Sequence, residues 1–177
     1  MIIFFDFDDV LFNRNKFISA LAGELGLSLD EFLRDYNNYF KKKKKNYSLR
    51  EHLKILGKFY QREKWDLFFK DLSKFVYPGT REALSALQRG KTGKMILLSR
   101  GDKDFQEKKI QGSGLRGFFE EVIIASDKIS FLSSRNFKEE VIFINDKQEE
   151  NKKIKKYFPE FKIAESLDDF KKLIKKI

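Results

Sequence analysis

Five short apolar runs alternate along the chain with longer stretches of helical or mixed pattern. The runs are residues 2–7, 95–98, 122–125, 141–144 and 161–164. Runs of this length suit strands that are buried on both faces, as in a parallel sheet covered by helices. The alternation therefore predicts an α/β fold with a central parallel sheet and helical crossovers.

Residues 13–77, between the first and second runs, show helical periodicity and no strand-like run. Ser28 with Glu31, and Ser48 with Glu51, have the spacing of a capping box, in which two side chains satisfy free backbone groups at a helix start. Two stripes of apolar side chains fall on single helical faces: Leu49, Leu53, Leu56 and Tyr60, then Trp65, Phe68, Phe69, Leu72 and Phe75. The segment is predicted to be a small all-helical insert packed by these stripes.

The composition favours one folded domain with an insert. The chain has 177 residues, of which 41% are apolar and 36% charged, and this balance suits a globule rather than a disordered chain. Cysteine is absent, which excludes disulfides and thiolate metal sites. No apolar run has the length of a membrane span, and the first twelve residues carry three aspartates instead of a basic leader. We expect a cytoplasmic monomer with no membrane partner.

The net charge of +10 has two interpretations. A positive surface attracts phosphate-rich partners, and the run Lys41 to Lys45 lies among aromatic residues that could stack on bases. These aromatic residues are Tyr36, Tyr39, Phe40 and Tyr47. The alternative is a bias toward Lys, Phe, Ile and Asn without any binding role, with the lysine run as a solvated helix end. We favour this alternative, because five adjacent lysines on a helix point in all directions and cannot share one groove.

Acidic residues mark the end of the first predicted strand. Asp6, Asp8 and Asp9 follow the apolar run directly, and ligands of open α/β sheets bind beyond the carboxyl ends of the strands. Alternation along the strand points Asp6 and Asp8 to the same side. Two crowded carboxylates repel each other, and a cation relieves that repulsion. Mg²⁺ suits the site, because it prefers oxygen ligands.

Other predicted strands also end in polar or charged groups. The second ends at Ser99 and Arg100, where a hydroxyl and glycine-adjacent backbone can hold phosphoryl oxygens. The third is followed by Lys128, and the fourth by Asp146, with Glu150 just beyond. His52 is the only histidine, and it has no evident partner in the sequence, so a histidine-based mechanism is not expected.

The stretch Phe-Phe-Asp-Phe-Asp-Asp-Val-Leu at residues 4–11 resembles the first motif of the haloacid dehalogenase superfamily. Ser99 after an apolar run is similar to the second motif, Lys128 to the third, and Asp146 with Glu150 to the fourth. The resemblance covers essentially the whole chain. It implies a three-layer Rossmann-like core formed by residues 1–12 and 78–177, with residues 13–77 as a helical cap over the sheet edge.

The resemblance also implies a reaction. Members with aspartate at the position of Asp8 are phosphatases or phosphomutases, whereas the dehalogenases lack it. Asp6 would then be the nucleophile and form a phospho-aspartate, while Asp8 would act as general acid and then as base. Mg²⁺ would be held by Asp6, the backbone carbonyl of Asp8, and Asp146.

The remaining roles complete the expected site. Ser99, Arg100 and Lys128 would bind the phosphoryl group of a small phosphorylated substrate, and Glu150 would position Lys128 or a metal-bound water. Two residues depart from the family pattern: Asn145 precedes the fourth-motif aspartate where many members have Gly or Asp, and Ile129 replaces a frequent proline. A phosphomutase of the same fold and a basic nucleic-acid-binding protein that retains the fold stay open as alternatives. The sequence does not name the substrate.

Overall fold

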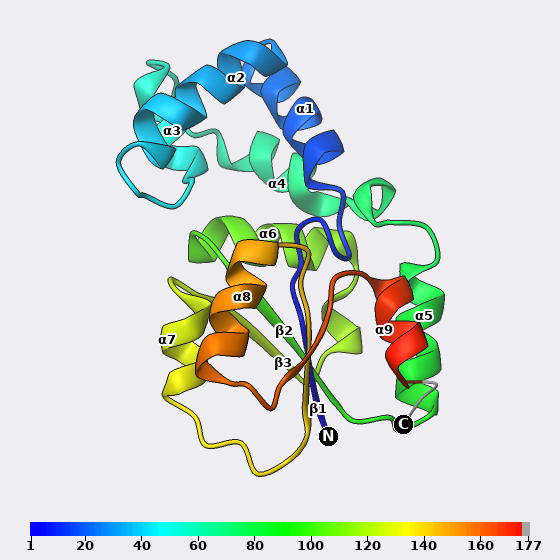
Figure 1. The fold of residues 1–177 in the computed structure, drawn as a ribbon. Coiled ribbons are helices and arrows are strands. Elements are labelled where there is room, and N and C mark those ends of the chain that lie inside the picture. The colour runs from blue at the N-terminus through cyan, green and yellow to red at the C-terminus, as the bar shows by residue number, and fades with distance from the viewer. Residues whose placement is uncertain (175–177) are drawn as a thin grey trace.

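A parallel sheet forms the centre of the computed structural model, which describes residues 1–174. Its five strands lie in the order β3-β2-β1-β4-β5, and all neighbouring pairs are parallel. The strands are β1 (Ile2–Phe5), β2 (Lys94–Arg100), β3 (Glu121–Ala125), β4 (Val141–Ile144) and β5 (Lys162–Ala164). Each predicted strand is present within two residues of its expected bounds. The α/β Rossmann-like fold is confirmed (Figure 1).

Helices cover both faces of this sheet. They are α5 (Thr80–Arg89), α6 (Lys103–Ser113), α7 (Lys128–Ser133), α8 (Gln148–Tyr157) and α9 (Leu167–Ile174), with a 3-10 turn at Arg116–Phe118. Phe4 and Phe5 show why three layers form, since neighbours on a strand point to opposite faces. Phe5 packs in the apolar cluster that includes Leu84 of α5 and Ile110 of α6. Phe4 packs in the other cluster, against α7 and α8.

Residues 13–77, here called the cap segment, contain only helices between the core elements. These are α1 (Arg14–Leu25), α2 (Leu29–Asp35), a π-helix at Tyr36–Lys41, α3 (Leu49–Ile55), α4 (Arg62–Lys70) and a 3-10 turn at Ser73–Phe75. In Figure 1 they form a layer above the carboxyl ends of the strands. Among the described residues, no helix is both long and apolar enough to cross a membrane.

The helix starts of the cap segment agree only in part with the sequence. Ser28 and Glu31 form the predicted capping box, with reciprocal hydrogen bonds to each other's backbone N–H. The prediction for Ser48 is wrong, because its side chain caps no backbone group. Glu51, its expected partner, instead forms an ion pair with Lys45 at 3.0 Å. The apolar stripes also extend past the helices that begin them: Tyr60, Leu72 and Phe75 lie beyond the ends of α3 and α4.

Backbone hydrogen bonds join the two ends of the cap segment. Asn13 N donates to Phe75 O at 2.7 Å, and Tyr77 N donates to Leu11 O at 3.0 Å. A second attachment lies on α6, where Leu72 N donates to Gly112 O at 2.8 Å. A Cβ atom at Gly112 would lie 2.0 Å from Phe69 O, so only glycine allows this close approach. The cap segment therefore packs directly on α6.

Candidate active site

Asp6 lies immediately after β1, the central strand, and its side chain is almost fully buried. Phe7 N donates to Asp6 Oδ1 at 2.8 Å. The other carboxylate oxygen, Oδ2, lies 2.8 Å from Lys128 Nζ and 3.3 Å from Lys147 Nζ. Two ammonium groups thus converge on one oxygen and offset the buried negative charge of Asp6.

Lys128 is held in place by two residues that follow β4, one in the loop and one in α8. It begins α7, and only 1% of its surface is exposed. Its Nζ donates to Glu150 Oε2 at 3.0 Å and to Asn145 Oδ1 at 3.4 Å. A buried ammonium is stable only when it is paired and hydrogen-bonded. Glu150 and Asn145 therefore hold Lys128 against Asp6, whereas the role of Glu150 in the reaction stays a prediction.

The loop after β4 is closed by a pair of asparagines. Asn145 Nδ2 donates to Asn151 Oδ1, and Asn151 Nδ2 donates to the backbone oxygen of Asn145, both at 2.8 Å. Both side chains are buried. This reciprocal pair gives Asn145, one of the departures from the family pattern, a structural reason, because its amide both closes the loop and supports Lys128.

Asp146 follows this pair and carries an unusual oxygen. Its Oδ1 is buried and has no hydrogen-bond partner among residues 1–174. Burial raises the pKa of Asp146, and the nearby charges of Asp6 and Asp9 raise it further, although Lys147 opposes them. A bound cation would satisfy the free oxygen and offset the repulsion between the carboxylates.

The donor set around Asp146 fits Mg²⁺. No group of three or more His, Cys, Asp or Glu side chains within residues 1–174 is arranged to hold a metal ion. The expected set, however, contains two carboxylates, Asp6 and Asp146, with a backbone carbonyl at Asp8. Mg²⁺ is typically bound by one or two carboxylates and keeps several waters, so this small set of oxygens suffices.

Asp8 is held by two residues of α6. Lys109 Nζ lies 2.5 Å from Asp8 Oδ1, and Gln106 Nε2 donates to Oδ2 at 3.1 Å. Burial opposes the negative charge, but the Lys109 ammonium and these hydrogen bonds outweigh it and lower the pKa of Asp8. Burial lowers the pKa of Lys109 in turn, in spite of its pairing with Asp8. The carboxylate is therefore ionised, whereas the sequence-based mechanism began with a protonated Asp8.

Gln106 also connects Asp8 to the end of β2. Its Nε2 lies 3.0 Å from Ser99 Oγ and 3.0 Å from Arg100 O. A Cβ atom at Gly101 would lie 2.7 Å from Gln106 Cγ, so the glycine makes room for this side chain. Ser99 is buried, whereas Arg100 is exposed and its guanidinium lies 3.9 Å from Glu150.

Asp9 shapes the turn that leads from β1 to the cap segment. Its backbone has φ of 64°, a left-handed conformation that aspartate tolerates better than most residues. Its Oδ1 accepts from Arg14 N at 3.2 Å, at the start of α1. Burial and the charge of Asp8 raise the pKa of Asp9. Asp9 thus links the acidic edge of the sheet to the first cap helix.

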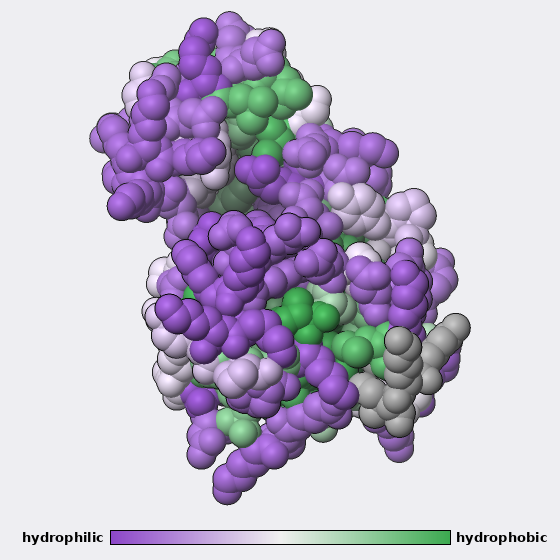
Figure 2. All heavy atoms as spheres, viewed as in Figure 1, coloured by the Kyte–Doolittle hydropathy of each residue, from purple (hydrophilic) through white to green (hydrophobic). Residues whose placement is uncertain are grey.

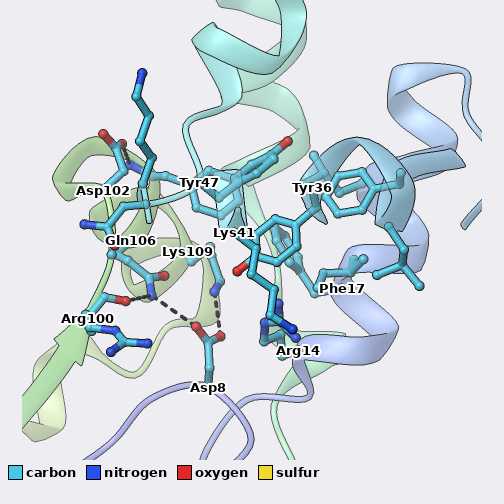
Figure 3. A pocket seen from close by; sticks show the side chains of 18 of the residues that line it. Asp8, Arg14, Phe17, Tyr36, Lys41, Tyr47, Arg100, Asp102, Gln106 and Lys109 are labelled. Carbon is cyan, nitrogen blue, oxygen red and sulfur yellow. Dashed lines mark hydrogen bonds and ion pairs between the residues drawn. The ribbon is translucent and has the colours of Figure 1, made fainter. Parts of the chain in front are cut away.

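A cavity of about 710 Å³ opens between the cap segment and this edge. Asp8, Gln106 and Lys109 lie at its core side, and α1, α2 and the π-helix line its cap side. Figure 3 shows side chains from both parts converging near Asp8. Figure 2, viewed as in Figure 1, shows a mostly hydrophilic surface with a hollow between the cap segment and the core, in which hydrophobic residues are visible.

The expected residues come together at one edge, with additions that the sequence did not reveal. Asp6, Ser99, Lys128 and Asp146 lie at or just beyond the ends of strands β1 to β4, as expected from a parallel sheet. Lys147, Lys109, Gln106 and Asn151 were missed. Lys147 could have been found from its place beside Asp146, whereas the others carry no local signal.

The description of His52 as lacking a partner is wrong. The ring is buried in the cap segment, with Nδ1 3.1 Å from Tyr47 Oη and Nε2 3.5 Å from Asp35 Oδ2. These partners lie 5 and 17 residues away in sequence, so local spacing did not reveal the second. The ring thus packs inside the cap segment.

Comparison with solved structures supports the fold. A haloacid dehalogenase-like hydrolase from Burkholderia xenovorans is 22% identical, with a TM-score of 0.70, over 92% of this chain and 80% of that one. A hydrolase from Streptococcus pneumoniae is 12% identical, with a TM-score of 0.60, over 98% and 97%. The L-2-haloacid dehalogenase of Xanthobacter autotrophicus, with chloropropionic acid covalently bound, is 13% identical, with a TM-score of 0.54 and 98% coverage of both chains.

Sequence comparison identifies the family. No curated protein sequence matches the chain significantly. The family model of the haloacid dehalogenase-like hydrolases matches residues 1–173, nearly the whole length. With the parallel sheet and the similar solved folds, this match makes the chain an enzyme of the hydrolase class, and it belongs to the haloacid dehalogenase-like hydrolases.

Proposed function

We propose that this enzyme is a Mg²⁺-dependent phosphatase that hydrolyses a phosphate monoester through a phospho-aspartate on Asp6. One observation carries the proposal: the buried Asp6 carboxylate is flanked by the ammonium groups of Lys128 and Lys147, and a second carboxylate, Asp8, follows two residues later. The cations would receive the phosphoryl oxygens, and Asp8 would serve proton transfer.

Dehalogenation is the competing activity, since the family includes dehalogenases. The Xanthobacter autotrophicus enzyme is too distant in sequence to carry its activity to this chain. Asp8 argues for phosphoryl transfer, because the dehalogenases of this superfamily lack an aspartate at that position. Asp8 is also built into the site by Lys109 and Gln106.

In the first step, an Asp6 oxygen attacks phosphorus in line, the bond from phosphorus to the alcohol oxygen breaks, and an acyl phosphate forms on Asp6. Lys128 and Ser99 would hold the phosphoryl oxygens. Such donors stabilise the charge that develops in the transition state, and each is typically worth about 2.7–4 kcal/mol.

The departing alcohol oxygen needs a proton, and the Asp8–Lys109 pair is its source in this proposal. The pair shares one proton, which Lys109 Nζ donates to Asp8 Oδ1 in a hydrogen bond. When Asp8 passes this proton to the leaving oxygen, the Asp8–Lys109 pair loses one proton. The pair then takes a proton from the water that attacks phosphorus, which releases inorganic phosphate and restores Asp6.

Asp6, the carbonyl of Asp8, and Asp146 would hold the Mg²⁺ ion. When bound, the ion reduces the repulsion between an anionic nucleophile and an anionic phosphate. The unpartnered Asp146 Oδ1 supports this placement. An Asp146→Ala variant is expected to bind Mg²⁺ more weakly than the parent in calorimetric titration.

The test is release of inorganic phosphate from p-nitrophenyl phosphate with Mg²⁺. Asp6→Asn preserves size but removes the nucleophilic charge, so we expect no turnover from this variant, while an Asp104→Asn control at an exposed position of α6 keeps parental activity. Free phosphate distinguishes hydrolysis from a mutase transfer. Chloride release from 2-chloropropionate without phosphate release, or substantial phosphatase activity in a folded Asp6→Asn variant, would contradict the proposal.

A further inference from the structure

Positive charge is unevenly compensated around the cavity beside Asp8. On the core side, each cation that lines the cavity has a carboxylate within 4 Å: Lys109 with Asp8, Lys147 with Asp6, and Arg100 with Glu150. This side is therefore close to neutral before any ligand binds.

The cap side differs. Arg14, Lys41, Lys44 and Lys45 line the cavity there. Lys45 pairs with Glu51. Within residues 1–174, the other three have no carboxylate within 4.0 Å; the ion pairs of the described chain do not include them. The cap side thus carries a surplus of about three positive charges.

The acidic residues of the cavity do not compensate this surplus. Asp8 and Asp102 are its only acidic lining residues among those described. Asp8 is committed to Lys109, and Asp102 accepts from Phe105 N as the N-cap of α6. Like charges gathered around one cavity repel each other unless an anion lies between them.

Arg14 is the cation placed to act on a ligand near Asp8. It begins α1, it is half-buried, and its guanidinium lies 5.8 Å from the centre of the Tyr36 ring. Figure 3 shows the Arg14 side chain on the cap side of the cavity, near Asp8 and Lys109. Arginine suits phosphate and carboxylate, because its planar donors can bind two oxygens at once.

The π-helix brings part of the lysine run to the same cavity. Tyr36, at its first position, and Lys41, at its last, both line the cavity. π-helices are rare in proteins, and those that occur are often found at functional sites. Lys44 and Lys45 also line the cavity, whereas Lys42 and Lys43 do not. Lys42 instead donates to Asn38, and Lys43 lies over the Tyr39 ring.

The uncharged part of the cavity wall includes five aromatic side chains: Phe17, Phe32, Tyr36, Tyr47 and Phe105. A cavity of about 710 Å³ falls within the range of sites that enclose whole small molecules, roughly 300–1,000 Å³. The space therefore suits a ligand longer than a phosphoryl group and a short alcohol.

We propose that the substrate carries a second anionic group, a phosphate or a carboxylate, which Arg14 and Lys41 bind at the cap end while the scissile phosphoryl group lies at Asp6. The inference rests on the proposed phosphatase activity and adds the substrate class to it. Asp8 and Lys109 stay at the reacting end, and the aromatic wall contacts the middle of the substrate.

The test compares substrates that differ only by the second anion. The pairs are fructose 1,6-bisphosphate with fructose 6-phosphate, and 3-phosphoglycerate with glycerol 3-phosphate. We expect the parent enzyme to have a higher kcat/KM for the doubly anionic member of at least one pair. A preference within the first pair would identify the second anion as a phosphate, and a preference within the second pair would identify it as a carboxylate. One charge-assisted hydrogen bond is worth about 1.5–3 kcal/mol, or a change of at least about tenfold.

Two variants and a matched control locate the effect. Arg14→Gln and Lys41→Gln should each lower the ratio of kcat/KM between doubly and singly anionic substrates by about tenfold. Lys43→Gln, in the same lysine run but outside the cavity, should leave that ratio within twofold of the parent. A parent that hydrolyses both members of both pairs equally well would overturn the inference and leave the phosphatase proposal standing.

Binding separates this inference from the proposed function. Calorimetry on the Asp6→Asn variant, with the same four compounds, should show tighter binding of a doubly anionic compound, and this preference should disappear when Arg14→Gln is added. Equal binding within both pairs would overturn the inference even if no substrate is hydrolysed. If a 5′-phosphorylated oligonucleotide binds with strong salt dependence that Lys41→Gln and Lys43→Gln weaken equally, the lysine run acts as a nucleic-acid surface and the cavity assignment is wrong.

Discussion

Lys109 is the residue whose replacement tests the buried ion pair most directly. Its ammonium lies 2.5 Å from Asp8 Oδ1, and only 3% of its side chain is exposed. Lys109→Met keeps a side chain of similar length but leaves Asp8 buried without its cation. Gln106 still donates to Asp8 Oδ2 in the variant, so part of the local order remains.

The size of the effect follows from opposing contributions. At 2.5 Å and an effective dielectric constant of about 20, the attraction between the two charges is about 7 kcal/mol. Removing Lys109 also removes the cost of burying its ammonium, which is several kcal/mol. The destabilisation by an unpaired Asp8 has an upper limit, because the carboxylate can take up a proton instead. For a carboxyl of ordinary pKa, protonation at pH 7.5 costs about 5 kcal/mol. We expect Lys109→Met to lower the free energy of unfolding by about 3 kcal/mol.

Urea unfolding at pH 7.5 with a chelator present measures this effect, and an unchanged m-value shows that stability alone has changed. Lys108→Met is the matched control, because Lys108 is the adjacent residue of α6 and forms a partly exposed pair with Asp66. Pairs of this kind are worth about 0–1 kcal/mol. The double variant Asp8→Asn/Lys109→Met should recover about 2 kcal/mol relative to Lys109→Met, because no unpaired charge remains buried. If Lys109→Met costs no more than Lys108→Met, or if the double variant recovers nothing, the reasoning about the pair is refuted.

Two further predictions concern the loop after β4 and the cap segment. Asn151→Ala removes both hydrogen bonds to Asn145, so it should lower the free energy of unfolding in urea titrations by about 2 kcal/mol. It should also reduce kcat, because Asn145 supports Lys128. A kcat equal to that of the parent would show that the loop does not position this lysine. Burial lowers the pKa of His52, so below about pH 6.5 the unfolded chain binds a proton that the folded chain does not, and this part of the stability is lost as the pH falls, by at most about 1.4 kcal/mol per pH unit. Unfolding between pH 7.5 and 5.5 should be less pH-dependent in His52→Gln than in the parent, and equal slopes would contradict the assignment.

The fold could be predicted from the sequence because its strands are uniformly apolar. Strands β1 and β4 are buried on both faces, so they appear in the sequence as the uninterrupted apolar runs Ile-Ile-Phe-Phe and Val-Ile-Phe-Ile. The residues that follow a parallel strand lie at a common edge, and this placed Asp6 and Asp146 together without knowledge of the rest. Their roles in metal binding and catalysis stay predictions.

The remainder of the site depends on contacts that local patterns do not encode. Gln106 and Lys109 face inward from α6, but their partner Asp8 lies 98 and 101 residues earlier in the chain. A polar residue in a predicted helix is also normally assigned to the solvent-exposed face. The lysine run shows the same limit. The argument that its members cannot all face one groove agrees with the structure, where Lys42 and Lys43 lie outside the cavity. The helix expected for the run ends at Lys41, and the turn that follows it, with Lys44 in a left-handed conformation, has no signal in the sequence.

The chain leaves and re-enters the catalytic core through two backbone segments that are hydrogen-bonded to each other, Leu11 to Asn13 and Phe75 to Tyr77. Topologically, everything between them is an insertion at a single point. Chain can be lengthened, shortened or exchanged there without shifting β1 or α5, because the ends that must meet are already adjacent. A change in the length of the cap segment therefore need not alter the pairing of β1 with β2 and β4, which holds the acidic sheet edge together.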